Sequence, residues 1–173
     1  MKRINVRSLC ECALLVALEV ILNRFVSFQM VGLKFGLSFL PMALSGMMFG
    51  PWAAAVCYAL GDLIGSLLFP MGPYFPGFTL TCALMGAVYG FIFQNKDKLR
   101  FWPEIIVSAI VNCGILGLCL NSFWMSVLYS SKGFTGWLVY RLPQEAGLFI
   151  LHLLLLPLIS TILKRIQKGK QII

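Results

Sequence analysis

The chain has 173 residues, of which 60% are hydrophobic, and its mean hydropathy is +0.89. Its 14 lysine and arginine residues stand against only six acidic residues, which gives a net charge of +8. Too few polar residues are present to cover the surface of a water-soluble protein, so the composition excludes a soluble globular fold and indicates an integral membrane protein.

Six apolar segments follow one another along the chain, and each approaches the roughly 20 residues that cross a bilayer as a helix. The predicted membrane helices are 8–23, 35–49, 51–69, 76–93, 102–128 and 143–163. The second and third are short and meet at Gly50-Pro51, where we expect a tight turn because glycine permits unusual backbone angles and proline fixes its own. The predicted fold class is all-α, with residues 1–173 forming a single domain of six transmembrane helices.

The first segment starts with basic residues, as a signal peptide does. No small-residue cleavage site follows residues 23–25, so we expect this segment to be retained as the first helix. The alanines Ala13 and Ala17 lie four apart on it, among large aliphatic residues. Small residues at this spacing let helices approach closely in lipid. This stripe either packs inside the bundle or meets another protein.

Glycine pairs at the same spacing occur in the second, third and fourth helices, and we expect them to pack helices together inside the bundle. They are Gly46 with Gly50, Gly61 with Gly65, and Gly86 with Gly90.

Basic residues gather on one side of the predicted topology. If the N-terminus is cytoplasmic, ten of the 14 lie on the cytoplasmic side: Lys2, Arg3, Arg7, Lys96, Lys98, Arg100, Lys164, Arg165, Lys168 and Lys170. The positive-inside rule therefore predicts that both termini are cytoplasmic. This distribution explains the positive charge without a nucleic-acid partner.

The connections on the two sides differ in kind. The inner connection at 94–100 is a charged loop that we expect to be solvated, whereas the outer connections at 23–34, 70–76 and 128–143 are long and aromatic. Interfacial aromatic belts account for part of this pattern. Three long outer loops nevertheless indicate that the chain builds a binding surface on its outer side.

No catalytic or nucleotide-binding motif is present: the sequence contains no HExxH, GxSxG or GxxxxGK[ST] pattern. The one histidine, His152, is expected to be a hydrogen-bond partner between helices. The six cysteines all lie in apolar segments without a CxxC pair, so we expect packing roles and no metal site. We predict no enzymatic activity and no cofactor, and any active transport must draw its energy from another subunit.

Acidic residues within the predicted helices are informative, because a charge inside a bilayer is costly and is usually paired or faces a cavity. Asp62 and Glu19 are either buried partners of a neighbouring helix or part of such a cavity. The outer placement of Arg24, Arg141, Asp62 and Glu145 permits an outward-facing cavity that carries both signs of charge.

The residue types around such a cavity suggest its ligand. Arg24 and Arg141 offer paired donors for carboxylates, and Glu145 could accept a pair of N–H groups. Flat faces are offered by Tyr74, Phe75, Phe78, Trp124, Trp137 and Tyr140. We therefore expect a ligand with an anionic end, a conjugated middle and a hydrogen-bonding heterocycle.

Three stretches together resemble a known family: SFLP at 38–41, GDLIG at 61–65 and PMGPYFPGFTL at 70–80. They resemble the substrate-binding S components of energy-coupling factor (ECF) vitamin transporters, and most of all the folate-specific members. The resemblance covers essentially the whole chain, and the YFPGFTL stretch is its most specific part.

The resemblance implies a bundle in the bacterial plasma membrane that binds a vitamin from outside and delivers it by reorienting within the membrane. It also implies partners: an EcfT-like transmembrane coupling protein, which would dock on Ala13 and Ala17, and two ATPase subunits. For folate, the tail carboxylates would meet Arg24 or Arg141, and the rings would meet Phe75, Phe78, Trp124 or Tyr140. The amino edge of the pterin would meet Glu145 or Asp62.

Other functions predict features that differ from these. A self-sufficient secondary transporter predicts inverted repeats, and the two halves of this chain do not align by pattern. A membrane enzyme needs a convergent catalytic set. Another vitamin remains an alternative within the family: biotin carries one carboxylate, whereas riboflavin carries none.

Overall fold

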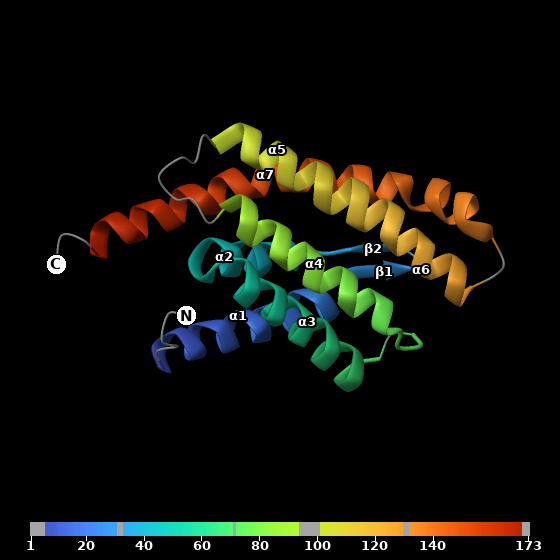
Figure 1. Cartoon of the computed structure of the whole chain (residues 1–173), viewed down its shortest axis with the longest axis horizontal. Helices are drawn as coiled ribbons and strands as arrows, with labels where there is room; N and C mark the ends of the chain where they lie inside the picture. Colours follow the sequence, from blue (N-terminus) through green and yellow to red (C-terminus); the bar gives the residue numbers. More distant parts are fainter. Residues whose placement is uncertain (1–5, 31–32, 71, 94–100, 130–131, 171–173) are drawn as a thin grey trace.

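In the computed structural model, the described residues are 6–30, 33–70, 72–93, 101–129 and 132–170, and they form an elongated helical bundle with one small hairpin (Figure 1). The elements are α1 (Val6–Arg24), β1 (Phe28–Met30), β2 (Leu33–Phe35), α2 (Phe39–Phe49), α3 (Pro51–Leu68), α4 (Pro76–Phe93), α5 (Phe101–Ala109), η2 (Ile110–Leu120), α6 (Asn121–Leu128) and α7 (Gly133–Lys170). The helix α1 begins, and α7 ends, at the same end of the bundle.

Among the described residues, four helical stretches are long and apolar enough to cross a membrane: Pro51–Leu68, Pro76–Phe93, Trp102–Leu128 and Gly133–Ile159. The helix α2 is a shorter apolar helix. Large apolar side chains face outward from these stretches; Trp52 is 78% exposed and Leu154 is 66% exposed. Such surfaces are stable against lipid tails and unfavourable in water, which agrees with the predicted membrane protein.

The predicted turn between the second and third helices is confirmed. The helix α2 ends at Phe49, Gly50 has a φ of +86°, and Pro51 is the first residue of α3. Only glycine adopts this backbone conformation without strain, and a proline at the first helical position loses no helical hydrogen bond.

The outer segment at 23–34 was expected to be a loop, but the described part of it contains a hairpin. The strands β1 and β2 are antiparallel, with Phe28 opposite Phe35 and Met30 opposite Leu33. Strands of three residues are too short to show a clear alternation of apolar and polar residues, so the sequence pattern did not predict them.

The predicted helix at 102–128 is one continuous rod, but its middle is wider than an α-helix. The elements α5, η2 and α6 follow each other without a break, and the η2 segment, Ile110–Leu120, is π-helical. In a π-helix the backbone bonds join residues five apart, and such segments are frequent at functional sites.

The last helix begins earlier than expected. The predicted start was Pro143, whereas α7 begins at Gly133 and includes both Pro143 and Pro157. Proline is tolerated within membrane helices because neighbouring groups satisfy the freed carbonyls. Most of the predicted outer loop at 128–143 is therefore the first turns of α7.

The helices α2, α3 and α4 pack closely at the end where α3 begins. A Cβ atom on Gly90 would lie 2.2 Å from the Cα of Pro51, and one on Gly86 would lie 2.5 Å from the carbonyl oxygen of Ala54. The core beside this contact is apolar and includes Met42, Phe93 and Leu156. The prediction that glycine pairs pack helices together is thus confirmed for Gly86 and Gly90.

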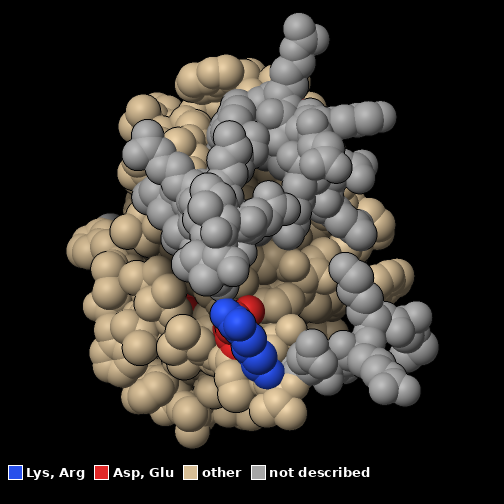
Figure 2. All heavy atoms as spheres, turned by 90° about the vertical axis from the view of Figure 1, so that its left-hand side faces the viewer, with Lys and Arg blue, Asp and Glu red and all other residues tan. Residues whose placement is uncertain are grey.

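Figure 2 views the end of the bundle where α1 begins and α7 ends, and its described surface carries one small group of basic and acidic side chains. The described ion pair at the start of α1 joins Arg7 to Glu11 at 3.1 Å. The predicted charged loop at 94–100 and the basic residues Lys2 and Arg3 lie outside the described residues. The same holds for the side chains of the basic residues at 164–170.

Candidate ligand-binding cavity

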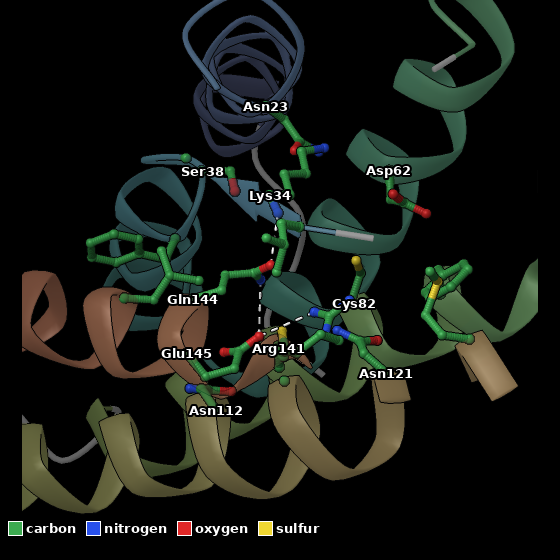
Figure 3. Close-up of a pocket in the computed structure, with 18 of the residues that line it drawn as sticks. Asn23, Lys34, Ser38, Asp62, Cys82, Asn112, Asn121, Arg141, Gln144 and Glu145 are labelled. Carbon is green, nitrogen blue, oxygen red and sulfur yellow. Dashed lines mark hydrogen bonds and ion pairs between the residues drawn. The ribbon is translucent and has the colours of Figure 1, made fainter. Parts of the chain in front are cut away.

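A cavity of about 780 Å³ lies between the helices, toward the end where α1 ends and α4 begins. Residues from α1, the hairpin, α2, α3, α4, η2, α6 and α7 line it, and Figure 3 shows many of their side chains converging on a common space. Tyr74 is part of the lining and is 42% exposed, so the cavity opens beside the connection between α3 and α4.

One wall of the cavity carries two cations that form no ion pair within the described part of the chain. Arg24 is the last residue of α1, and Lys34 lies in β2. Among the described residues, no carboxylate lies within 4.0 Å of either side-chain charge, and the Nε atom of Arg24 is buried without a hydrogen-bond partner. Unpaired, partly buried cations are costly unless an anion binds there, so this wall is suited to an acidic ligand group.

The environment of Lys34 reflects this crowding of positive charge. Burial, and next the nearby Arg24 guanidinium, lower the pKa of Lys34 from its usual 10.5 to about 8, although Asp62 opposes the shift. Lys34 thus remains mostly protonated at neutral pH, and a bound anion would favour its charged form.

Asp62 of α3 lies at the mouth of the cavity, where it links α3 to α4. Its Oδ2 atom accepts a hydrogen bond of 2.8 Å from the Thr79 hydroxyl, which lies 3.2 Å from the hydroxyl of Tyr74. Asp62 thus faces the cavity and is held by a hydrogen bond to α4, which combines the two interpretations left open by the sequence.

The opposite wall, on α7, carries charges that bind each other. The Nη2 atom of Arg141 donates to Oε1 of Glu145 at 3.1 Å, and the side-chain amide of Gln144 donates to the same oxygen at 3.1 Å. Gln144 also accepts a hydrogen bond of 2.7 Å from the backbone N–H of Lys34, so this network ties the hairpin to α7 (Figure 3). Arg141 and Glu145 are 8% and 7% exposed, which makes this a buried ion pair.

The end of the cavity farthest along α4 from its mouth is flat and aromatic. The imidazole of His152 stacks on Phe39 at a centroid distance of 3.9 Å, and its Nε2 atom hydrogen-bonds the hydroxyl of Tyr89. His152 of α7 is therefore linked to Tyr89 of α4, as expected for a hydrogen-bond partner between helices. The cysteine Cys113 lies beside them in the lining, with its Sγ atom 3.7 Å from Nδ1 of His152.

At the mouth, a second aromatic group surrounds Phe75. Its ring lies 6.0 Å from Phe78 and 5.5 Å from Trp124, measured between centroids. Trp124 donates a hydrogen bond of 3.0 Å to the hydroxyl of Thr81 and supports Phe75 from behind.

The structure brings together seven of the nine residues predicted to bind ligand. They are Arg24, Asp62, Tyr74, Phe75, Phe78, Arg141 and Glu145, all of which line the cavity. Trp124 and Tyr140 are not part of the lining. Tyr140 instead holds the ammonium group of Lys132 3.7 Å from its ring centroid. Because α7 is already helical at this point, Tyr140 does not share the direction of Arg141.

Glycines make room for the charged side chains around the cavity. A Cβ atom on Gly61 would lie 2.0 Å from Oε2 of Glu19, and one on Gly65 would lie 2.9 Å from Nε of Arg24. Glu19 is fully buried and accepts a hydrogen bond of 2.8 Å from Asn23 of its own helix. Gly61 and Gly65 are buried and pack α3 against α1 inside the bundle, as predicted, but they face side chains of α1 rather than a neighbouring backbone.

Sequence reasoning missed several lining residues, chiefly Lys34, Asn112, Asn121 and Gln144. Lys34 was assigned to an outer loop. The three amides are uncharged and therefore produce no clear interruption in hydropathy. The π-helical segment that places Asn112 and Gly117 on the side of the cavity is a feature of the structure and left no signal in the apolar periodicity.

The alanine stripe of α1 lies outside the bundle. Ala13 and Ala17 are exposed, as are their neighbours Leu14 and Leu18. The stripe therefore does not pack against the described helices of this chain.

Comparisons with known proteins agree on one family. The family model described as "ECF transporter, substrate-specific component" matches residues 7–160. The folate transporter FolT of Clostridium novyi (strain NT) is 36% identical over 152 residues, covering 88% of this chain and 86% of that protein. The FolT of Leuconostoc mesenteroides is 28% identical over 127 residues, covering 73% and 68%. A crystal structure of FolT bound with folic acid superimposes with a TM-score of 0.83 at 31% identity, covering 91% of this chain and 95% of that one.

Proposed function

This chain belongs to the substrate-specific components of ECF transporters, and we propose that it is the folate-binding member of such a transporter. It captures folate in the cavity between α1, α4 and α7 and performs no catalysis itself. The observation that carries this proposal is a pair of cations, Arg24 and Lys34, which form no ion pair among the described residues and lie in a cavity that also offers flat aromatic faces.

The chemistry of folate fits the two kinds of wall. Its glutamate tail has two carboxylates, and the cavity offers two cations that form no ion pair among the described residues, so each carboxylate can have one cation. The aromatic rings of folate can lie against Phe75 and Phe78 near the mouth. Arg141 is already bonded to Glu145, which makes Arg24 and Lys34 the better pair for the tail. Biotin has one carboxylate and would leave one cation unpaired.

The proposal is tested by titrating the purified protein with folate, biotin and riboflavin. We expect saturable binding of folate and no comparable binding of the other two. The variants Arg24→Ala and Lys34→Ala should each weaken folate binding by roughly ten- to a hundredfold, because hydrogen bonds to charged groups are worth about 1.5–3 kcal/mol.

A matched control is available in Lys132, another basic residue near this end of the bundle, whose ammonium group lies against Tyr140 outside the cavity. The variant Lys132→Ala should keep the wild-type affinity. Wild-type protein that binds biotin more tightly than folate would contradict the proposal, as would Arg24→Ala and Lys34→Ala variants that bind folate normally.

We propose further that Ala13 and Ala17 contact an EcfT-like transmembrane coupling protein, which works with two ATPase subunits in the bacterial plasma membrane. Their exposure on α1 supports this, because small exposed residues allow a close helix crossing. Six spans with both termini cytoplasmic would suit the distribution of basic residues.

The contact is tested by the variants Ala13→Trp and Ala17→Trp of α1, with Ile150→Trp, at an exposed position of α7, as the control. The alanine variants should bind folate normally but fail to co-purify with the coupling module and to support uptake. Loss of folate binding in the isolated variants would show that the stripe serves the bundle itself.

A further inference from the structure

We propose that Glu19 of α1 takes up a proton when folate binds, so that the vitamin and a proton are captured together. This inference rests on the proposed folate ligand and deepens it. In the binding step, one proton leaves the solvent and forms an O–H bond on the carboxyl group of Glu19. The proton returns to the solvent when folate leaves the cavity.

Glu19 is a buried carboxyl group that lies one layer behind the cavity wall. It is fully buried and is not part of the lining, but Asn23, which donates a hydrogen bond of 2.8 Å to its Oε1 atom, does line the cavity. Figure 3 shows Asn23 on the same side of the cavity as Lys34. The Oε2 atom of Glu19 has no hydrogen-bond partner among the described residues. A carboxylate in such a place costs far more than a neutral carboxyl group, because a charge loses its hydration on burial.

Nearby positive charge offsets part of this cost while the cavity is empty. The Arg24 guanidinium and the Lys34 ammonium both stabilise the charged form of Glu19, although neither lies within 4.0 Å of it in the described part of the chain. The Oε2 atom of Glu19 lies against Gly61. The Nε atom of Arg24 lies against Gly65, which is four residues and about 6 Å farther along α3. The charge on Glu19 therefore depends on the two cations that we propose as the binding groups for the folate tail.

The other titratable groups that the structure places near Glu19 come from α3 and α4. Asp62 adds a second negative charge, whereas Tyr58 and Cys82 are neutral groups at pH 7. The helix α2 also packs against α1 and contains no titratable residue. Asp62 accepts a hydrogen bond from Thr79 at the mouth of the cavity, and Glu19 is fully buried. Glu19 is therefore the acid that accepts the proton.

The charges of this region show why binding should move a proton. When all four groups are ionised, two acids and two cations balance each other in the empty protein: Glu19 and Asp62, with Arg24 and Lys34. Folate brings two further carboxylates to the cations, so Glu19 loses their support and gains negative neighbours. Like charges close together inside a protein favour protonation of one of them. A proton on Glu19 removes one of the unbalanced negative charges.

The test counts the protons that accompany folate binding to the purified protein. The heat of binding is measured between pH 6 and 7 in phosphate and in imidazole buffer, whose different ionisation heats give the number of protons taken up. The carboxylates of folate are already ionised in this range. We expect wild type to take up about 0.2–1 proton per folate, and Glu19→Gln less than about 0.1. Glu11→Gln, on a glutamate near the start of the same helix that pairs with Arg7, is the matched control and should equal wild type.

Two further measurements record the same event. By linkage, the folate affinity of wild type should fall about two- to eightfold from pH 6 to pH 7, whereas that of Glu19→Gln should stay nearly constant. The infrared difference spectrum of the wild-type protein should gain the C=O band of a protonated carboxyl group when folate is added. This last measurement needs no variant, so it holds even if Glu19→Gln fails to fold.

The outcomes separate this inference from the proposed function. Wild-type protein that binds folate without proton uptake between pH 6 and 7, or without the new infrared band, would overturn the inference. Equal proton uptake by Glu19→Gln and wild type would do the same. Uptake that occurs only above pH 8 would belong to Lys34, whose pKa is about 8, and would also contradict a role for Glu19. Wild-type protein that does not bind folate would instead overturn the proposed function.

Discussion

Gly90 and Gly61 both lie in long apolar helices and each has a second glycine four residues away, yet they meet different neighbours. A Cβ atom on Gly90 would meet the backbone of Pro51 and Gly50, whereas one on Gly61 would meet the end of the Glu19 side chain. The first contact brings two helices together at the end where α3 begins. The second makes room for a polar group at the other end.

This difference shows that one spacing of small residues serves two purposes in the same bundle. At the packed end, Gly46, Gly86 and Gly90 face backbone atoms of neighbouring helices, which cannot move independently. Around the cavity, Gly61, Gly65 and Gly117 face Glu19, Arg24 and Glu145. Substitutions at the two ends should therefore affect different properties, and the predictions below test that separation.

The largest effect is expected at the packed end. In Gly90→Ala the new methyl group would overlap the backbone of Pro51, so α3 and α4 must separate. We expect a loss of at least about 3 kcal/mol of stability, because overpacking of a rigid contact cannot be relieved by a side-chain rotation. Thermal unfolding in detergent measures this loss. An unfolding temperature equal to that of wild type would contradict the proposed division between the ends.

A smaller effect on stability is expected at Gly61. Its substitution by alanine displaces the carboxylate of Glu19, which is fully buried but lies on a flexible side chain, so the cost should be about 1–2 kcal/mol. The double variant Gly61→Ala with Glu19→Ala should be more stable than the sum of the single changes predicts. Truncation of Glu19 removes the atoms that the new methyl group would overlap, and the methyl group fills part of the space that the truncation leaves. Strict additivity in the same unfolding assay would show that the two residues do not interact.

At Gly65 we expect an effect on binding and little on stability. The added methyl group would lie 2.9 Å from Nε of Arg24 and should push the guanidinium away from its place in the lining. Folate affinity should fall about three- to tenfold, with an unfolding temperature close to that of wild type. Gly114→Ala is a matched control, because a Cβ atom there meets nothing within 4 Å. Equal effects of the two changes on folate binding would argue against a role for Gly65.

The smallest effect is a pH dependence that belongs to one wall of the cavity. Since the pKa of Lys34 is lowered to about 8 and an acidic ligand favours its charged form, folate binds best below pH 8. Binding should weaken as the pH rises through 8 toward 9.5, by less than tenfold per pH unit. The variant Lys34→Met should bind folate more weakly at pH 7 and should lose the part of the pH dependence that Lys34 causes. Titration of folate itself affects both proteins equally. A wild-type profile that matches the Lys34→Met profile would remove Lys34 from the site.

Helix limits were predictable where proline and glycine mark them. The segments expected at 51–69 and 76–93 agree with α3 and α4 within one residue, because Pro51 and Pro76 start both helices. The same rule failed at Pro143, which lies inside α7, since packing in a membrane protein can satisfy the carbonyl that proline leaves free. The hairpin and the π-helical segment depend on local hydrogen bonding that apolar periodicity does not record.

For the cavity, charge was the informative property. Arg24, Asp62, Arg141 and Glu145 were selected because charged residues are rare and costly within apolar segments, and all four line the cavity. Asn112 and Gln144 were missed because neutral amides are tolerated in apolar helices at less cost. Trp124 and Tyr140 were selected by type and side of the membrane alone. Trp124 lies one layer behind the lining, against Phe75, and Tyr140 lies against Lys132 outside it.

The helix α1 is a single rod of 19 residues, and its two sides face different surroundings. Glu19 and Asn23 lie against α3 and the cavity, while Ala13 and Ala17 lie on the exposed side. A stiff rod cannot roll one side without carrying the other, so any tilt or roll that a filled cavity imposes on Asn23 would be displayed at the alanines about 9–15 Å away along the axis. The orientation of the exposed side of α1 would then depend on whether the cavity is occupied.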